Sequence, residues 1–132
     1  MNTAKRYFFR KENKLKSRKI IQQIFAEGNS FTVFPLKVMW LPSNEKNTLQ
    51  AGISVSSRYF KRAVDRNRIK RLIREAYRLQ KIELEEHLSQ NHQQLSIFLI
   101  FIAKEIPDYQ TIFNASGRVI HKLIKVANEN HQ

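Results

Sequence analysis

The chain has 132 residues, of which 42% are hydrophobic, and a formal net charge of +13 at neutral pH. This length and composition predict one folded domain over residues 1–132 and exclude a wholly disordered basic tail. Disulfides and thiolate metal sites are excluded because the chain has no cysteine, and its longest apolar run, residues 97–103, is too short to cross a membrane. We therefore expect a cytoplasmic protein without a membrane partner.

The positive charge is concentrated in two blocks. Residues 1–19 carry a net charge of +7 and residues 58–81 carry +8, so the other residues together carry −2. This distribution is typical of proteins that bind nucleic acid, although an anionic membrane would attract the same blocks.

Residues 1–14 combine basic and aromatic side chains without a regular period, which predicts a flexible basic arm. The pattern leaves open whether the arm is a frayed terminus or orders on RNA. From Ser17, a candidate N-cap, apolar residues at helical spacing predict a short helix that ends near Gly28.

Residues 31–41 alternate in hydrophobicity and predict a strand, in which Pro35 favours an edge position or a bulge. Residues 42–47 predict a long hairpin loop to a second strand at residues 49–55. One face of the first strand is expected to carry Phe34, Leu36, Val38 and Trp40, and the other face Val33, Lys37 and Met39.

Residues 63–81 predict a helix whose two sides differ in character, and Asp65 is one candidate for its start. A core-facing side is expected to hold Ile69, Leu72, Ile73, Ala76, Leu79 and Gln80. The opposite side is expected to hold Asn67, Lys70, Arg71, Arg74, Arg78 and Lys81, with Glu75 nearby. Cations crowded on one side of a helix repel one another, and binding to a polyanion relieves that repulsion, so this side is predicted to bind a polyanion. The alternative interpretation is an ordinary solvated charged surface.

The helical pattern is expected to continue through residues 82–88, followed by a buried strand at residues 95–103 and a last helix from Pro107 and Asp108. A strand, a helix and a buried strand form a βαβ unit. The prediction is therefore an α+β fold, a single-domain α-β sandwich with the order α-β-β-α-β-α.

Candidates for catalysis are weak. Glu83, Glu85 and Glu86 lie beside His87 at a spacing typical of solvated helix surface, and His121 lies on an amphipathic helix. No metal triad, phosphate-binding glycine loop or paired nucleophile and base is apparent. RNA binding is better supported, because an arginine side chain can donate two hydrogen bonds to one phosphate group. Asn67 suits either RNA contact or helix capping.

The sequence Arg66-Asn67-Arg68-Ile69-Lys70-Arg71-Leu72-Ile73-Arg74-Glu75 follows Gly52-Ile53-Ser54-Val55-Ser56. This combination resembles the signature of the protein subunit of bacterial ribonuclease P, the ribonucleoprotein that removes the 5′ leader from precursor tRNA. The similarity extends to Leu15 and to Phe25-Ala26-Glu27-Gly28.

The resemblance implies that a separate RNA subunit is the catalyst and that this protein has no catalytic site of its own. It implies two partners, the catalytic RNA and precursor tRNA, and a left-handed βαβ crossover. No cofactor is expected on the protein alone, and Mg²⁺ is expected in the RNA holoenzyme.

The RNA-binding residues implied by position are Arg66, Asn67, Arg68, Lys70, Arg71 and Arg74, to which we add Arg78, Lys61 and Arg62. The residues implied for the leader cleft are Ile21, Phe25, Lys37 and Met39. Ile21 replaces the commoner phenylalanine, which removes one stacking surface. The loop at residues 57–62 is one residue longer than usual and has no glycine, so its conformation is not transferred from the family.

Two other functions remain open from the sequence. A structural RNA-binding protein of the ribosome or its assembly would be equally basic. A protein-only nuclease is disfavoured because no acid/base cluster is apparent.

Overall fold

The computed structural model describes residues 14–15, 17–43 and 48–129. Within these ranges the elements are α1 (Arg18–Glu27), β1 (Asn29–Val33), β2 (Leu36–Pro42), β3 (Leu49–Val55), α2 (Ala63–Gln90), β4 (Leu95–Phe101) and α3 (Tyr109–Glu129). The basic arm predicted at residues 1–14 lies outside the described residues except for Lys14, which forms an isolated bridge with Ala51 of β3.

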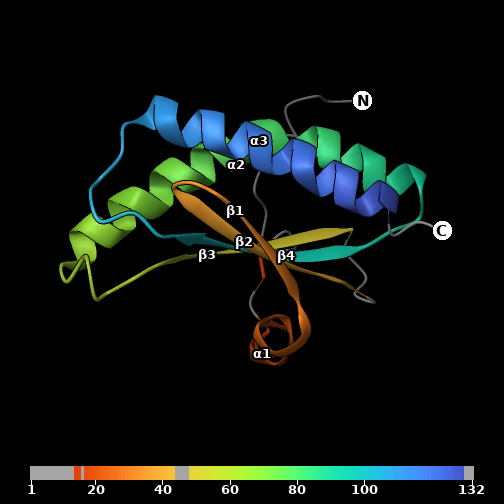
Figure 1. The fold of residues 1–132 in the computed structure, drawn as a ribbon, viewed down its shortest axis with the longest axis horizontal. Coiled ribbons are helices and arrows are strands. Elements are labelled where there is room, and N and C mark those ends of the chain that lie inside the picture. Colours follow the sequence, from red (N-terminus) through yellow and green to blue (C-terminus); the bar gives the residue numbers. More distant parts are fainter. Residues whose placement is uncertain (1–13, 16, 44–47, 130–132) are drawn as a thin grey trace.

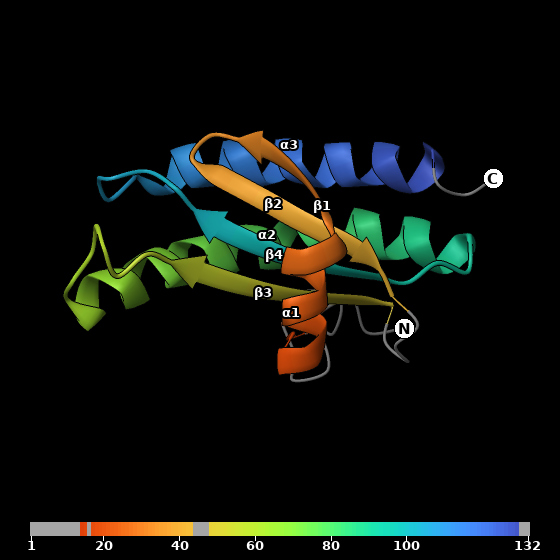
Figure 2. The ribbon, with the colours of Figure 1, turned by 60° about the horizontal axis from the view of Figure 1, so that its bottom comes forward.

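The four strands form one sheet in the order β1-β2-β4-β3. β1 with β2 and β2 with β4 pair antiparallel, whereas β3 with β4 pair parallel. α2 and α3 lie side by side on one face of the sheet, and α1 crosses the other face (Figures 1 and 2). The predicted α+β sandwich is therefore confirmed.

The segment expected as one strand at residues 31–41 is two strands. Phe34 and Pro35, joined by a cis peptide bond, form the turn between β1 and β2, and Val33 pairs with Leu36 across it. The turn reverses the chain, so Val33 is buried while Phe34 is 70% exposed, opposite to the predicted faces. The predicted element order holds, with this one additional strand.

The hairpin predicted between the next two strands is wrong. β4 lies between β2 and β3, so that Phe98 pairs with Met39 on one side and with Gly52 on the other. Alternation along a strand reveals which side chains share a face, but it does not reveal which strand is the neighbour.

The β3-α2-β4 unit is left-handed. Figure 2 views the sheet from the α1 side, with α2 behind it and both strands pointing to the left. When the view is turned so that the strands point upward, β4 lies to the right of β3 and the connection passes behind the sheet. This confirms the expected hand, which is rare among βαβ units.

The main core lies between the sheet and the pair α2 and α3. β2 contributes Leu36, Val38 and Trp40, and α2 contributes Ile69 and Ile73. On β4 the odd-numbered side chains from Leu95 to Phe101 are buried in this core, whereas Phe98 and Ile100 on the α1 side are half-buried. The predicted strand is thus fully covered on one face and partly covered on the other.

Side-chain caps mark the N-terminal ends of α1 and α3. Ser17 Oγ accepts a hydrogen bond from the Ile20 amide at 3.3 Å, which confirms the predicted N-cap of α1. Asp108 accepts one from the Thr111 amide at 2.8 Å at the start of α3. α2 begins at Ala63, two residues before Asp65. No helix in the described ranges is long and apolar enough to cross a membrane.

Candidate nucleic-acid interface

One side of α2 presents cations to solvent. We call it the α2 basic face, and it consists of Asn67, Arg68, Lys70, Arg71 and Arg74. Lys70 is half-buried and the others are exposed, because Ile69 and Ile73 turn the opposite side into the core. None of the four cations has a hydrogen bond or ion pair within the described part of the chain. Their charges therefore remain available to a polyanion.

Arg66 has a different environment from the other basic residues of the motif. Its Nη1 atom donates to the backbone carbonyls of Phe60 and Lys61, both at 2.8 Å. Phe60 is buried against Phe101, with ring centroids 5.9 Å apart. Arg66 thus holds residues 56–62 onto the start of α2, a role that sequence reasoning missed.

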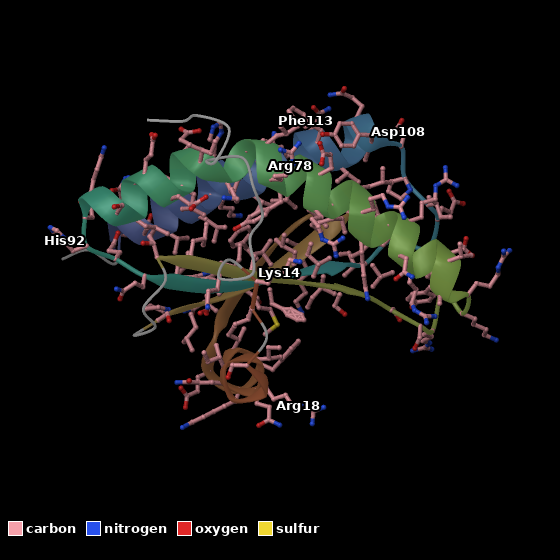
Figure 3. All side chains as sticks on the ribbon, turned by 180° about the vertical axis from the view of Figure 1, so that it is seen from behind. Lys14, Arg18, Arg78, His92, Asp108 and Phe113 are labelled. Atoms are coloured by element: carbon pink, nitrogen blue, oxygen red, sulfur yellow. The ribbon has the colours of Figure 1, made fainter. Side chains whose placement is uncertain are left out.

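Arg78 and Lys81 are less available for contact with a polyanion than the sequence predicted. Arg78 is half-buried and donates to both carboxylate oxygens of Glu75, at 2.6 and 3.1 Å. This hydrogen bonding lowers the pKa of Glu75 below its ordinary value. Figure 3 shows Arg78 beside the first turns of α3. Lys81, predicted on the charged side, is only 2% exposed and is paired with Glu85.

The loop that leads into α2 adds exposed cations near its first turn. Lys61 and Arg62 are exposed, and Arg62 approaches Asp65 only to 3.9 Å. Tyr59, 44% exposed, lies between Arg58 and Lys104, whose charged groups are 5.8 and 5.3 Å from its ring centroid. The two aromatic residues flanked by basic residues at 58–62 were the available signal for Tyr59, which the site prediction omitted.

The four residues predicted for the leader cleft lie together on the α1 side of the sheet. Lys37 and Met39 point to this side of β2, and Ile21 and Phe25 lie on α1 above it. Phe25 is 52% exposed and meets the ring of Phe98 edge-on at 5.4 Å. Phe98 is a further aromatic of this surface that the prediction missed, because the apolar run at 95–103 gave no face assignment.

The two groups of predicted residues include helices on opposite faces of the sheet, α1 for the leader cleft and α2 for the basic face. Figure 3 shows Arg18 on α1 and Arg78 on α2 on opposite sides of the sheet. The residues predicted for the leader cleft thus belong to α1 and the sheet, and those of the α2 basic face to the helix layer on the other face.

The acidic cluster at the end of α2 is divided among separate partners. Glu85 pairs with Lys81, and Glu83 lies 3.7 Å from His121. His87 is paired with Asn91 through its backbone carbonyl, at 2.8 Å. Within the described ranges, no three His, Cys, Asp or Glu side chains are grouped so as to hold a metal ion.

Comparisons with known proteins agree with the sequence resemblance. A family model described as Ribonuclease P matches residues 9–124. A ribonuclease P protein component from Porphyromonas gingivalis is 36% identical over 119 residues, which cover 89% of this chain and 85% of the relative. One from Clostridium botulinum is 34% identical over 115 residues, covering 85% and 95%.

Solved structures of similar fold include the RNase P protein of Staphylococcus aureus, with a TM-score of 0.63 and 26% identity. That match covers 86% of this chain and 96% of the other. The RNase P protein of Thermotoga maritima, with a TM-score of 0.64, 23% identity and coverages of 83% and 96%, supports the fold alone.

Proposed function

The chain belongs to the ribonuclease P protein family, and from this premise we propose that it is the protein component of ribonuclease P, acting in removal of the 5′ leader from precursor tRNA. The observation that carries the proposal is the family match over residues 9–124, which includes the residues of both the leader cleft and the α2 basic face. The relatives described above are all ribonuclease P proteins, so the ribosomal alternative has no support among them.

In this proposal the catalytic RNA binds the α2 basic face. Unpaired arginine and lysine side chains on a rigid helix match the repeating charge of an RNA backbone, and each phosphate contact releases counterions. Lys61 and Arg62 extend the contact beyond the helix start. Arg66 supports the face by fixing the loop, and Arg78 supports it by neutralising Glu75.

The 5′ leader of precursor tRNA binds the leader cleft on the α1 side of the sheet. Phe25, Phe98 and Met39 supply apolar and aromatic contacts for unpaired bases, and Lys37 supplies charge for a phosphate. Stacking on aromatic rings tolerates different bases, so the cleft suits leaders of varied sequence.

The chemical step belongs to the RNA subunit in this proposal, as the family resemblance implies. The protein brings leader and RNA together and screens the repulsion between the two nucleic acids. Mg²⁺ is assigned to the RNA, since the exposed side of α2 is cationic and the Glu75 carboxylate is already held by Arg78. The cytoplasm is the compartment that fits this activity.

Reconstitution tests the proposal. The protein is combined with a bacterial ribonuclease P RNA, and cleavage of the 5′ leader from precursor tRNA is measured over a range of magnesium concentrations. We expect cleavage to begin at a lower magnesium concentration with the protein than with the RNA alone. An equal magnesium requirement with and without the protein would show that the proposed function is wrong.

A further inference from the structure

α1 divides the open face of the sheet into two flanks. Ile24 is fully buried beneath the helix, while Ile21 and Phe25 lie on the flank of the leader cleft. Lys19 and Gln23 lie on the other flank, because successive helical residues are about 100° apart around the axis. The second flank has its own surface, which the proposed function does not use.

A cavity of about 270 Å³ lies on this second flank. The first turns of α1 line it with Ser17, Lys19 and Gln23, and the sheet lines it with Leu41 and Ser96, which are paired across β2 and β4. We call this cavity the Ser96 pocket. It is much larger than the roughly 30 Å³ that one water occupies in the liquid.

Ser96 gives the pocket an unsatisfied polar group. The residue is 1% exposed, and its Oγ atom has no hydrogen-bond partner among the residues that the structure describes. A buried hydroxyl without a hydrogen-bond partner destabilises a fold, because it has lost its hydrogen bonds to water. A ligand that accepts a hydrogen bond from Ser96 would remove that cost.

The surroundings of the hydroxyl favour a negative charge. The pocket is at the N-terminal end of α1, a ten-residue helix whose dipole is positive there. Lys19 adds a cationic side chain from the same turn. Ser17 Oγ accepts a hydrogen bond from the Ile20 amide and so caps this helix end. The side-chain donors that remain in the pocket for an anion include the Ser96 hydroxyl and the Lys19 ammonium.

We propose that the Ser96 pocket binds a phosphate group, with Ser96 Oγ donating to one phosphate oxygen and Lys19 together with the α1 N-terminus balancing its charge. The proposal does not rest on the proposed function, because neither the α2 basic face nor the leader cleft takes part. The phosphate can come from an RNA backbone or from the free anion, and the experiment separates these sources.

The test is a titration of the full chain, ¹⁵N-labelled, with inorganic phosphate, followed through the amide NMR signals of Ile20 and Ser96. Ionic strength is held constant with sodium chloride. We expect both signals to shift and saturate, and Ser96→Ala to weaken the binding about tenfold, because hydrogen bonds to charged groups are strong. Ser96→Thr, which keeps the hydroxyl, should retain the response.

Lys125→Ala is the matched control, since Lys125 is an exposed lysine on α3, across the sheet from the pocket. It should leave the titration at Ile20 and Ser96 unchanged. Lys19→Gln, an exposed substitution that should not disturb folding, should weaken binding severalfold and serves as the second variant if Ser96→Ala fails to fold.

Shifts that never saturate, or equal affinity in the native chain and in both Ser96→Ala and Lys19→Gln, would overturn the proposal and leave water as the partner of Ser96. A second titration, with a single-stranded RNA oligonucleotide in place of inorganic phosphate, identifies the source of the phosphate. The same saturating shifts with RNA would assign the site to backbone phosphate. Saturation with inorganic phosphate alone would assign it to the free anion, and both outcomes support a phosphate site.

Discussion

Arg74 and Arg78 lie one turn apart on α2 but differ in what their guanidinium groups contact. Arg74 is exposed and unpaired within the described residues, whereas Arg78 is bound to Glu75. We predict that Arg74→Ala lowers affinity for ribonuclease P RNA and reduces the slope of log affinity against log salt by roughly 1, as expected for one lost phosphate contact. Binding measured at several salt concentrations checks this, with Lys125→Ala as control. An unchanged slope would remove Arg74 from the RNA contact.

Tyr77 makes the stability of the fold sensitive to alkaline pH. Burial, together with the nearby Glu85 charge, raises the pKa of its phenol well above the ordinary value. The unfolded chain therefore loses this proton at lower pH than the folded chain, so stability falls as pH rises above about 10. We predict that Tyr77→Phe unfolds at a higher pH than the native chain in an alkaline titration followed by circular dichroism. An identical midpoint would contradict this role.

Burial at single positions also marks where sequence reasoning succeeded and failed. Ile69 and Ile73 were placed in the core correctly. The prediction left Tyr77 out of the core side, and its burial turns the apolar arc of α2 toward Lys81 and away from Leu79, which is 39% exposed. Lys81 lies one turn beyond Tyr77 at the edge of this arc, and its burial and its pairing with Glu85 could not be predicted from its charge.

At the scale of elements, α1 is joined to β1 through Gly28 alone. Its φ of −71° suits any residue, so the requirement for glycine is spatial. A Cβ atom there would clash with the Ile24 carbonyl oxygen and would lie 3.0 Å from the Trp40 carbonyl oxygen. We predict that Gly28→Ala lowers the free energy of unfolding by roughly 2 kcal/mol, the range of overpacking, in urea denaturation.

Gly52→Ala is the control for Gly28. A Cβ atom at Gly52 would meet the Phe98 ring at 3.6 Å and Leu15 at 3.7 Å, which are ordinary contacts. Its stability should stay within about 0.5 kcal/mol of the native chain. Equal stability of both variants would show that the chain around Gly28 relaxes without cost.

Element types were more predictable than element neighbours. The period of apolar residues gave the three helices and the apolar strand β4, because local geometry determines that period. The pattern of apolar residues continues across Phe34 and Pro35, although the chain turns there. It therefore predicted one strand where the structure has β1 and β2. β4 lies between β2 and β3 because it pairs with strands that precede α2 in the sequence. A local residue pattern does not predict such long-range pairing.

At the scale of the whole molecule, the sheet separates the two proposed RNA contacts. Basic residues of the α2 face were predictable from charge and spacing, but the placement of α1 and α2 on opposite faces of the sheet was not, because it depends on tertiary packing. Contacts on separate surfaces without shared partners are expected to contribute independently to binding.

We therefore predict that Phe25→Ala weakens binding of leader-bearing precursor tRNA to the reconstituted enzyme at least fivefold, through lost stacking, and leaves mature tRNA unaffected. Combining it with Arg74→Ala should add the two free-energy losses within about 0.5 kcal/mol. Affinities of both tRNA forms for the single and double variants provide the measurement. A strongly non-additive double variant would indicate that one RNA segment contacts both faces.

α1 is attached to the molecule more lightly than the other helices. Among its residues only Ile24 is buried, and the helix packs mainly on β2 and β4, whereas α2 and α3 pack on each other and on the sheet. Elements with few buried contacts form the units that open first in hydrogen exchange. A single opening of α1 would dismantle the leader cleft and the Ser96 pocket together. Ligands on its two flanks would consequently each slow amide exchange in the same helix and reinforce each other's binding without touching.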